Sequence, residues 1–192
     1  MLSPTGIART TDGRDLAFCE WGSPAGSPVF FLHGMPGGRY FRHAGGEYDR
    51  IGMRVITFDR PGYGSSTRHA GRTIADGAGD VAAVADHLGV DRFAVLGASS
   101  GGPYALATAA IMHDRVTRCA TVVGSGPHDA PDLDAYAGMT PEEVEEWRKV
   151  ATGEWLVAHL PTAEAVWVDG NHFGPRDEPE EKLLAWLAGV EE

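Results

Sequence analysis

The sequence has little cysteine and no long apolar stretch, and both shortages restrict the class of protein. Two cysteines, Cys19 and Cys119, occur in 192 residues, too few for the disulfide framework of a small secreted domain. No apolar run approaches the ~20 residues that a membrane-spanning helix needs. The first residues lack the basic and then apolar order of a signal peptide. We therefore expect a reduced, cytoplasmic protein that has no membrane partner.

Basic residues are also scarce, and their distribution is uneven. The formal net charge is −11. Residues 1–128 carry 12 arginines against 11 acidic residues, whereas residues 129–192 carry 4 basic against 16 acidic residues. A protein that binds nucleic acid needs the opposite sign of charge. We expect no nucleic-acid partner and interpret the acidic third as solvated surface.

The length and composition favour one globular domain over residues 1–192. Apolar residues make up 43 % of the chain and charged residues 22 %, which is enough for a core and excludes a disordered chain. Short apolar runs alternate with segments of helical periodicity, which is typical of a parallel sheet with helices on both faces. The expected strands are 15–22, 28–34, 53–59, 92–97 and 117–124, and the expected helices between them are 39–50, 74–88 and 100–112.

The last third of the chain predicts fewer and less regular elements. Residues 125–140 have no clear period. Thr140, Pro141 and Glu143 form a capping box with proline in the first turn, which predicts a helix that ends near Gly153. A further helical turn or two at 155–160, a strand at 163–168 and a closing helix at 180–187 follow.

The most specific chemical signal is a G-x-S-x-G motif centred on Ser99. The motif lies between an apolar strand and an alanine-rich helix. Glycines at Gly97 and Gly101 permit a sharp turn that exposes the serine hydroxyl at its tip. The following helix directs free N–H groups and positive dipole toward the position where negative charge develops. We predict that Ser99 is a catalytic nucleophile.

Two backbone N–H groups are candidates for an oxyanion hole. Ser100 follows the nucleophile directly, so its N–H faces the reacting carbonyl oxygen. Met35 follows His33 and Gly34 at the end of another apolar strand, where a tight turn can direct its N–H toward Ser99. His33 itself ends a buried strand, and we interpret it as a structural residue rather than the base.

His172 is the candidate general base. It follows the late strand, and a base that meets Ser99 should come from another strand end on the same edge of the sheet. His128 follows the fourth apolar strand and stays open as an alternative. We expect the remaining histidines to be exposed residues of helices or loops: His43, His69, His87, His113 and His159.

These motifs together resemble the α/β-hydrolase fold superfamily, in its serine esterase and peptidase branch. Residues 33–37 are similar to the family's oxyanion loop, and residues 59–64 to the turn after the next strand. Residues 97–102 resemble the nucleophile elbow, and residues 171–173 the histidine loop. The resemblance implies an α/β fold and a serine hydrolase that needs no metal and no organic cofactor.

The chain departs from that family in its length after the fourth apolar strand. Relatives carry a helical lid and an acid-bearing strand before the histidine, but only 73 residues separate Ser99 from His172. The resemblance implies a truncated α/β-hydrolase fold in which residues 125–160 replace both the lid and the strand.

The third member of a catalytic triad is therefore open. Asp129 is the first candidate, because some relatives place the acid after the sixth strand of the fold. Asp132 in the same segment and Glu145 in the capped helix are alternatives. A site without an acid, or with an acid from another chain, is the remaining possibility.

The function predicted from the sequence is a carboxylesterase-like cleavage of small esters through an acyl-enzyme. The alternatives are a peptidase that has lost its specificity element, and a non-catalytic remnant or assembly module. We also expect a homodimer, because a deleted strand and lid expose a sheet edge and apolar surface. Trp147, Trp155 and Leu156 are the candidate interface residues.

Overall fold

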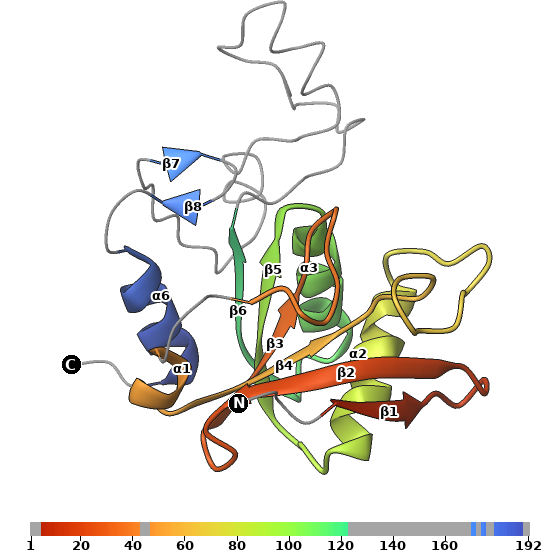
Figure 1. Ribbon diagram of the computed structural model, residues 1–192, viewed down its shortest axis with the longest axis horizontal. Helices are drawn as coiled ribbons and strands as arrows, with labels where there is room; N and C mark the ends of the chain where they lie inside the picture. Colours follow the sequence, from red (N-terminus) through yellow and green to blue (C-terminus); the bar gives the residue numbers. More distant parts are fainter. Residues whose placement is uncertain (1–4, 43–46, 123–169, 172–173, 176–178, 190–192) are drawn as a thin grey trace, which may run out of the picture.

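The computed structural model describes residues 5–42, 47–122, 170–171, 174–175 and 179–189. Its centre is a twisted sheet of six strands in the order β1-β2-β4-β3-β5-β6 (Figure 1). The strands are β1 (Thr5–Arg9), β2 (Asp15–Gly22), β3 (Ser27–Leu32), β4 (Met53–Phe58), β5 (Phe93–Ala98) and β6 (Val116–Val122).

Strand direction divides the sheet into two parts. The pairs β4–β3, β3–β5 and β5–β6 are parallel, whereas β1–β2 and β2–β4 are antiparallel. The expected α/β class with a mostly parallel sheet is confirmed. Because β3 and β5 are parallel neighbours, with Leu32 opposite Gly97, the loops at their carboxyl ends meet at one edge of the sheet.

Helices cover both faces of this sheet, as predicted. On one face, α2 (Asp76–His87) and α3 (Gly102–Ile111) pack on the larger apolar cluster, which contains Phe30, Phe93 and Val95. On the other face, α1 (Glu47–Arg50) and α6 (Pro179–Ala188) pack on a second cluster. Figure 1 shows the two helix pairs on opposite sides of the strands. The sheet is thus buried on both faces, as parallel strands require.

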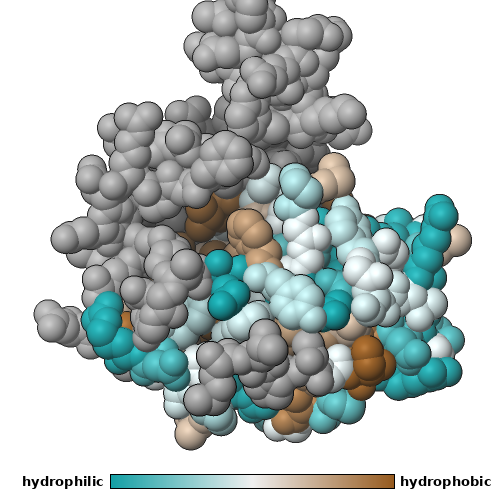
Figure 2. Space-filling model, in the orientation of Figure 1, coloured by the Kyte–Doolittle hydropathy of each residue, from teal (hydrophilic) through white to brown (hydrophobic). Residues whose placement is uncertain are grey.

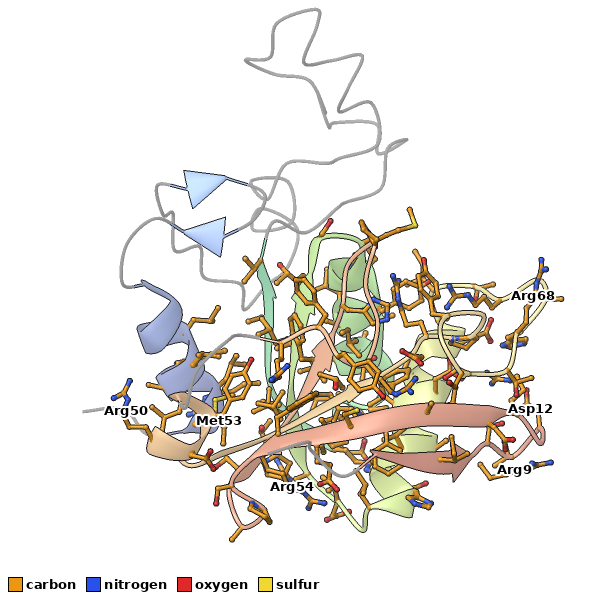
Figure 3. The ribbon with its side chains drawn as sticks, in the orientation of Figure 1. Arg9, Asp12, Arg50, Met53, Arg54 and Arg68 are labelled. Atoms are coloured by element: carbon orange, nitrogen blue, oxygen red, sulfur yellow. The ribbon has the colours of Figure 1, made fainter. Side chains whose placement is uncertain are left out.

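Met53 marks the centre of the second cluster. Its side chain is fully buried, and Figure 3 shows it at the start of β4, where α1 and α6 come together. Leu184 and Leu187 of α6 belong to the same cluster. The closing amphipathic helix of the sequence therefore returns to a sheet that begins more than a hundred residues earlier in the chain.

Two local predictions differ from the structure. The sequence did not indicate β1, which pairs along its whole length with β2; Gly6 belongs there because a Cβ atom would lie 2.3 Å from the Phe18 ring. The helix predicted over 39–50 is wrong at residues 39–42, which form a turn and irregular backbone; within 39–50 the structure describes a helix only at α1. The Arg39 carbonyl accepts from the Thr57 hydroxyl, which replaces the bond that this carbonyl would make in a helix.

Several expectations fall outside the described residues. These are the helices at 140–151 and 155–160, the strand at 163–168, and the proposed replacement of lid and acid strand at 125–160. The homodimer also stays a prediction, since Trp147, Trp155 and Leu156 belong to the same region. Within the ranges that the structure describes, no helix combines the length and apolar character needed to cross a membrane.

Candidate active site

Ser99 occupies a strained turn between a strand and a helix. Strand β5 ends at Ala98, and the 3₁₀ turn η1 (Ser99–Gly101) leads directly into α3. The φ angle of Ser99 is +50°, and among the described residues it is the only non-glycine residue with a positive φ. A side chain held in this left-handed region costs of order 1–3 kcal/mol and is typical of functional sites. The geometry is that of the turn which the G-x-S-x-G motif predicts.

The glycines of the motif are required by close backbone contacts. A Cβ atom at Gly101 would lie 2.0 Å from the Leu32 carbonyl oxygen, and one at Gly97 would lie 2.5 Å from the Gly101 carbonyl oxygen. The turn after β5 therefore packs directly against the end of β3. Any side chain at these two positions would displace Ser99 relative to the loop that follows β3.

That loop reaches the serine through Gly34. A Cβ atom at Gly34 would lie 2.9 Å from the Ser99 Cβ and 3.5 Å from its Oγ. Met35 follows with its side chain 66 % exposed, and its N–H forms no hydrogen bond to any residue that the structure describes. Ser100 is the second residue of η1, where backbone N–H groups lack a partner within the helix. The structure thus brings Ser99, Ser100 and the Gly34–Met35 peptide together.

His33 lies beneath this loop and is almost completely buried. Its Nδ1 lies 2.7 Å from the Gly34 carbonyl oxygen, so Nδ1 carries the proton and donates. Burial lowers the pKa of His33 below its ordinary value of 6.5, which favours the neutral ring. The ring also makes an edge contact with Tyr63, at 5.3 Å between centroids. These contacts agree with the structural role predicted for His33.

Arg60 is the buried cation of the site. It follows β4, is only 4 % exposed, and donates to both loops that meet at Ser99. Its Nη2 donates to the Gly34 carbonyl and to the Ser100 hydroxyl, both at 3.3 Å, and its Nη1 donates to the Ser100 carbonyl at 3.4 Å. The guanidinium also lies over the rings of Tyr63 and Tyr104. Within the described ranges, no carboxylate forms an ion pair with it.

Asp59 fixes the turn on which Arg60 is carried. Its carboxylate accepts the Arg39 N–H at 2.7 Å and the Ser65 N–H at 3.0 Å, and it forms an ion pair with the Arg39 guanidinium. A Cβ atom at Gly64 would lie 2.0 Å from an Asp59 oxygen. The buried carboxylate therefore ties the segment after β4 to the loop after β3.

The other predicted site residues lie outside the described part of the chain. His172 and Asp129 belong to this group, as do the alternatives Asp132 and Glu145, so their roles stay predictions. The structure describes no group of three or more His, Cys, Asp or Glu side chains that could hold a metal ion. The described part of the site is built from backbone amides, the hydroxyls of Ser99 and Ser100, the His33 ring and the Arg60 guanidinium.

A comparison with protein families shows which family this chain belongs to. A family model for the alpha/beta hydrolase fold matches residues 27–173, most of the chain. The chain belongs to the alpha/beta hydrolase fold family. This family assignment confirms the resemblance drawn from the motifs at residues 33–37 and 97–102.

Named relatives within the alpha/beta hydrolase family include peptidases and an esterase. A proline iminopeptidase from Xanthomonas citri is 40 % identical over 108 residues, which are 55 % of this chain and 34 % of that protein. A bifunctional esterase/perhydrolase from Acinetobacter calcoaceticus is 34 % identical over 50 % of this chain and 36 % of its own length. The matched region thus spans about a third of these relatives.

Solved structures of alpha/beta hydrolases share the fold at moderate similarity. An alpha/beta hydrolase fold protein from Nakamurella multipartita has a TM-score of 0.55 and 32 % identity, over 73 % of this chain and 47 % of that one. A thermophilic esterase from Thermogutta terrifontis has a TM-score of 0.51 and 27 % identity, over 76 % and 51 % of the two chains. The chain covers about half of each structure.

Sequence reasoning missed one feature of this alpha/beta hydrolase site. The sequence predicts the segment 59–64 only as a turn and assigns no role to Arg60. Its place directly after a buried strand was an available signal, because an arginine there must either turn outward or find polar partners inside. The partners are carbonyl groups of two distant loops, and backbone groups carry no identity in a sequence.

Proposed function

We propose that the protein is a serine hydrolase that cleaves small carboxylic esters through an acyl-enzyme. The observation that carries the proposal is the positive φ of Ser99 at the junction of β5 and η1, beside the Gly34–Met35 peptide. The close approach of Gly34 to Ser99 supports a site in which the hydroxyl lies near the N–H groups of Met35 and Ser100. A nucleophile and an oxyanion hole need that arrangement.

In the proposed mechanism, Ser99 Oγ attacks the ester carbonyl while His172 accepts its proton. The oxyanion is held by the N–H groups of Met35 and Ser100 until the alcohol leaves with the proton from His172. Water then attacks the acyl group, again with His172 as the base, and frees Ser99. Asp129 is proposed to orient His172 and stabilise its charged form.

The first experiment tests the nucleophile with p-nitrophenyl acetate and a fluorophosphonate probe. We expect a burst of p-nitrophenol and one labelled residue, Ser99, identified by peptide mapping. Ser99→Ala should lose both burst and label, whereas Ser100→Ala, the neighbouring serine, should keep the label on Ser99. Turnover or full labelling in Ser99→Ala would refute the proposal and favour a non-catalytic fold.

Peptide cleavage is the second candidate, favoured by the relatives named proline iminopeptidase. The same elbow and oxyanion donors serve amide cleavage, and the difference lies in how the amine end of a substrate is held. The decisive measurement compares kcat/KM for p-nitrophenyl acetate with kcat/KM for proline p-nitroanilide. Ser99-dependent cleavage of the anilide would replace the esterase proposal with a peptidase.

His172 and Asp129 can be tested with the same ester. His172→Ala should reduce kcat to near that of Ser99→Ala, because the two residues act as one unit. Asp129→Asn should lower kcat by up to about 10⁴-fold if this carboxylate orients the base. Parallel Asp132→Asn and Glu145→Gln variants identify the acid when Asp129→Asn has no effect.

A further inference from the structure

Arg60 donates to a carbonyl group on each of the two loops that border the predicted oxyanion hole, at Gly34 and at Ser100. The Gly34 carbonyl that accepts from Arg60 belongs to the same planar peptide as the Met35 N–H. That peptide is trans, since the described cis peptide is the next one along the chain. In a trans peptide the N–H points away from the C=O. A donor that holds the carbonyl therefore also fixes the direction of the N–H.

Two buried donors converge on the Gly34 carbonyl. His33 Nδ1 approaches it at 2.7 Å and Arg60 Nη2 at 3.3 Å. Hydrogen bonds to the oxygen of an amide polarise the whole group, so the N–H on the other side becomes a stronger donor. Because Arg60 is charged, its effect on the amide exceeds that of a neutral donor at the same distance.

The same guanidinium holds the second donor loop. Arg60 donates to both the carbonyl and the hydroxyl of Ser100, which limits rotation of the residue whose N–H follows the nucleophile. A planar guanidinium can reach both loops at once because its two Nη atoms are rigidly spaced. The rings of Tyr63 and Tyr104 lie beside it at 5.2 and 4.8 Å and replace the water that it has lost.

We infer that Arg60 is a positioning residue for both oxyanion donors: it aligns and polarises the Met35 N–H through the Gly34 carbonyl, and it restrains Ser100 through the carbonyl and hydroxyl of that residue. The inference rests on the proposed function, since it assigns a role within that same oxyanion hole. Arg60 does not touch substrate, and its effect is carried by the Gly34–Met35 peptide and by Ser100. The benefit is confined to states in which the carbonyl oxygen bears negative charge.

The test compares Arg60→Lys with wild type, using p-nitrophenyl acetate and phenylboronic acid. A lysine places one ammonium where the guanidinium bridges two loops. We expect kcat and kcat/KM to fall together by about 10- to 100-fold, less than complete loss of a donor causes. KM should stay within about two-fold, because ground-state binding is unaffected. The boronate, a tetrahedral anion on Ser99, should bind more weakly by a similar factor.

Arg39→Lys is the matched control. Arg39 is a neighbouring, largely buried arginine, but its partners are Asp59 and Tyr40 rather than the donor loops. At equal folded fraction, measured by fluorophosphonate titration, we expect it to change kcat and boronate affinity less than three-fold. Equal losses in both variants would show a general effect of a buried cation and would overturn the inference.

The remaining outcomes separate this inference from the proposed function. Ser99-dependent turnover in wild type, with kcat and boronate affinity unchanged in Arg60→Lys, overturns the inference alone. An inactive wild type overturns the proposed function and the inference with it. If Arg60→Lys does not fold, Ser100→Ala decides, because it removes one acceptor of Arg60 and keeps the backbone N–H. Parallel losses of about 2- to 10-fold in kcat and boronate affinity support the inference, and no loss refutes it.

Discussion

Gly34 and Ser99 are in backbone contact, although 65 residues separate them in the chain. A Cβ atom at Gly34 would lie 2.9 Å from the Ser99 Cβ and 3.1 Å from the Ala98 carbonyl oxygen. Real Cβ atoms do not approach other atoms so closely, so the contact exists only because residue 34 is glycine. The loop after β3 and the turn after β5 are positioned by each other.

Gly34→Ala should therefore impair the site more than the fold. The new methyl group must displace either Ser99 or the peptide that carries the Met35 N–H. We expect kcat/KM for p-nitrophenyl acetate to fall by about 100-fold or more, because a displacement near 1 Å suffices for such a loss. The melting temperature should change little. Gly79→Ala is the control, since Gly79 is an exposed glycine of α2 without a positive φ and with nothing within 4 Å of a Cβ atom, and this variant should keep full activity.

The buried pair of Arg14 and Asp80 predicts an asymmetric response to mutation. The Arg14 Nη1 lies 2.8 Å from the Asp80 carboxylate, whose side chain is 2 % exposed. Asp12 also contacts Arg14, and its exposed position at the β1–β2 turn is visible in Figure 3. Arg14→Met leaves the Asp80 charge uncompensated and should cost about 3–5 kcal/mol in the free energy of unfolding.

The double variant Arg14→Met, Asp80→Leu should recover most of that loss. Urea denaturation of wild type, Arg14→Met and the double variant is the measurement. Arg9→Met provides the control, because the Arg9–Asp15 ion pair is exposed, and exposed pairs contribute about 0–1 kcal/mol. Equal costs at Arg9 and Arg14 would contradict the prediction.

His33 predicts a loss of stability in mild acid. Burial lowers its pKa in the folded protein below 6.5, so the unfolded chain binds more protons in the window below pH 6.5. The free energy of unfolding therefore falls as the pH drops from 6.5 toward the folded pKa. In His33→Asn, whose amide can still donate to the Gly34 carbonyl, this part of the pH dependence should vanish. Urea titrations at pH 7.5, 6.5 and 5.5 measure the difference, and identical slopes in both proteins would refute it.

Neither cysteine should react as a thiolate in the folded protein. Burial raises the pKa of Cys119 to about 12 and also raises that of Cys19, while a thiol needs its ionised form to attack a disulfide reagent. At pH 8 we expect two thiols to react with an aromatic disulfide reagent only after guanidinium is added. Rapid reaction of one thiol in native protein, with no unfolding phase, would contradict this.

The homodimer can be tested without reference to catalysis. It rests on the sheet edge and apolar surface expected from the shortened region before His172, with Trp147, Trp155 and Leu156 as anchors. Light scattering at micromolar concentration and moderate salt should give twice the chain mass of 20.4 kDa. A mass near that of one chain refutes the dimer. Trp155→Ser should shift a true dimer toward monomer.

The sequence was most informative where periodicity and glycine punctuation agree. Strands β3, β4 and β5 and helix α2 lie within two residues of their predicted bounds, because buried parallel strands read as short apolar runs that end at turns. The turn that carries Ser99 was predictable for the same reason, since its motif follows one of these runs. In the space-filling view, hydrophilic residues gather at the right-hand end of the described surface, where the turn between β1 and β2 lies (Figure 2).

Other parts depend on contacts that a sequence does not display. Strand β1 is short and carries a glycine, and it exists because β2 offers it an antiparallel edge. Residues 39–42 avoid a helix because the Thr57 hydroxyl, 18 residues away, donates to the Arg39 carbonyl that helical bonding would use. Arg60 joins two loops through backbone carbonyl oxygens. Every residue has such an oxygen, so no pattern of side chains in the sequence predicts these contacts.

The positive φ angle of Ser99 means that the residue which would best stabilise the fold at this position is not the residue that the proposed reaction needs. A chain chosen for the free energy of unfolding alone would carry glycine at residue 99, as it does at Gly62 and Gly89, which share a positive φ. Serine is the worse choice for the fold and the necessary one for a nucleophile. A procedure that redesigns this protein for thermal stability would therefore remove its proposed activity at the first step, unless residue 99 were held fixed.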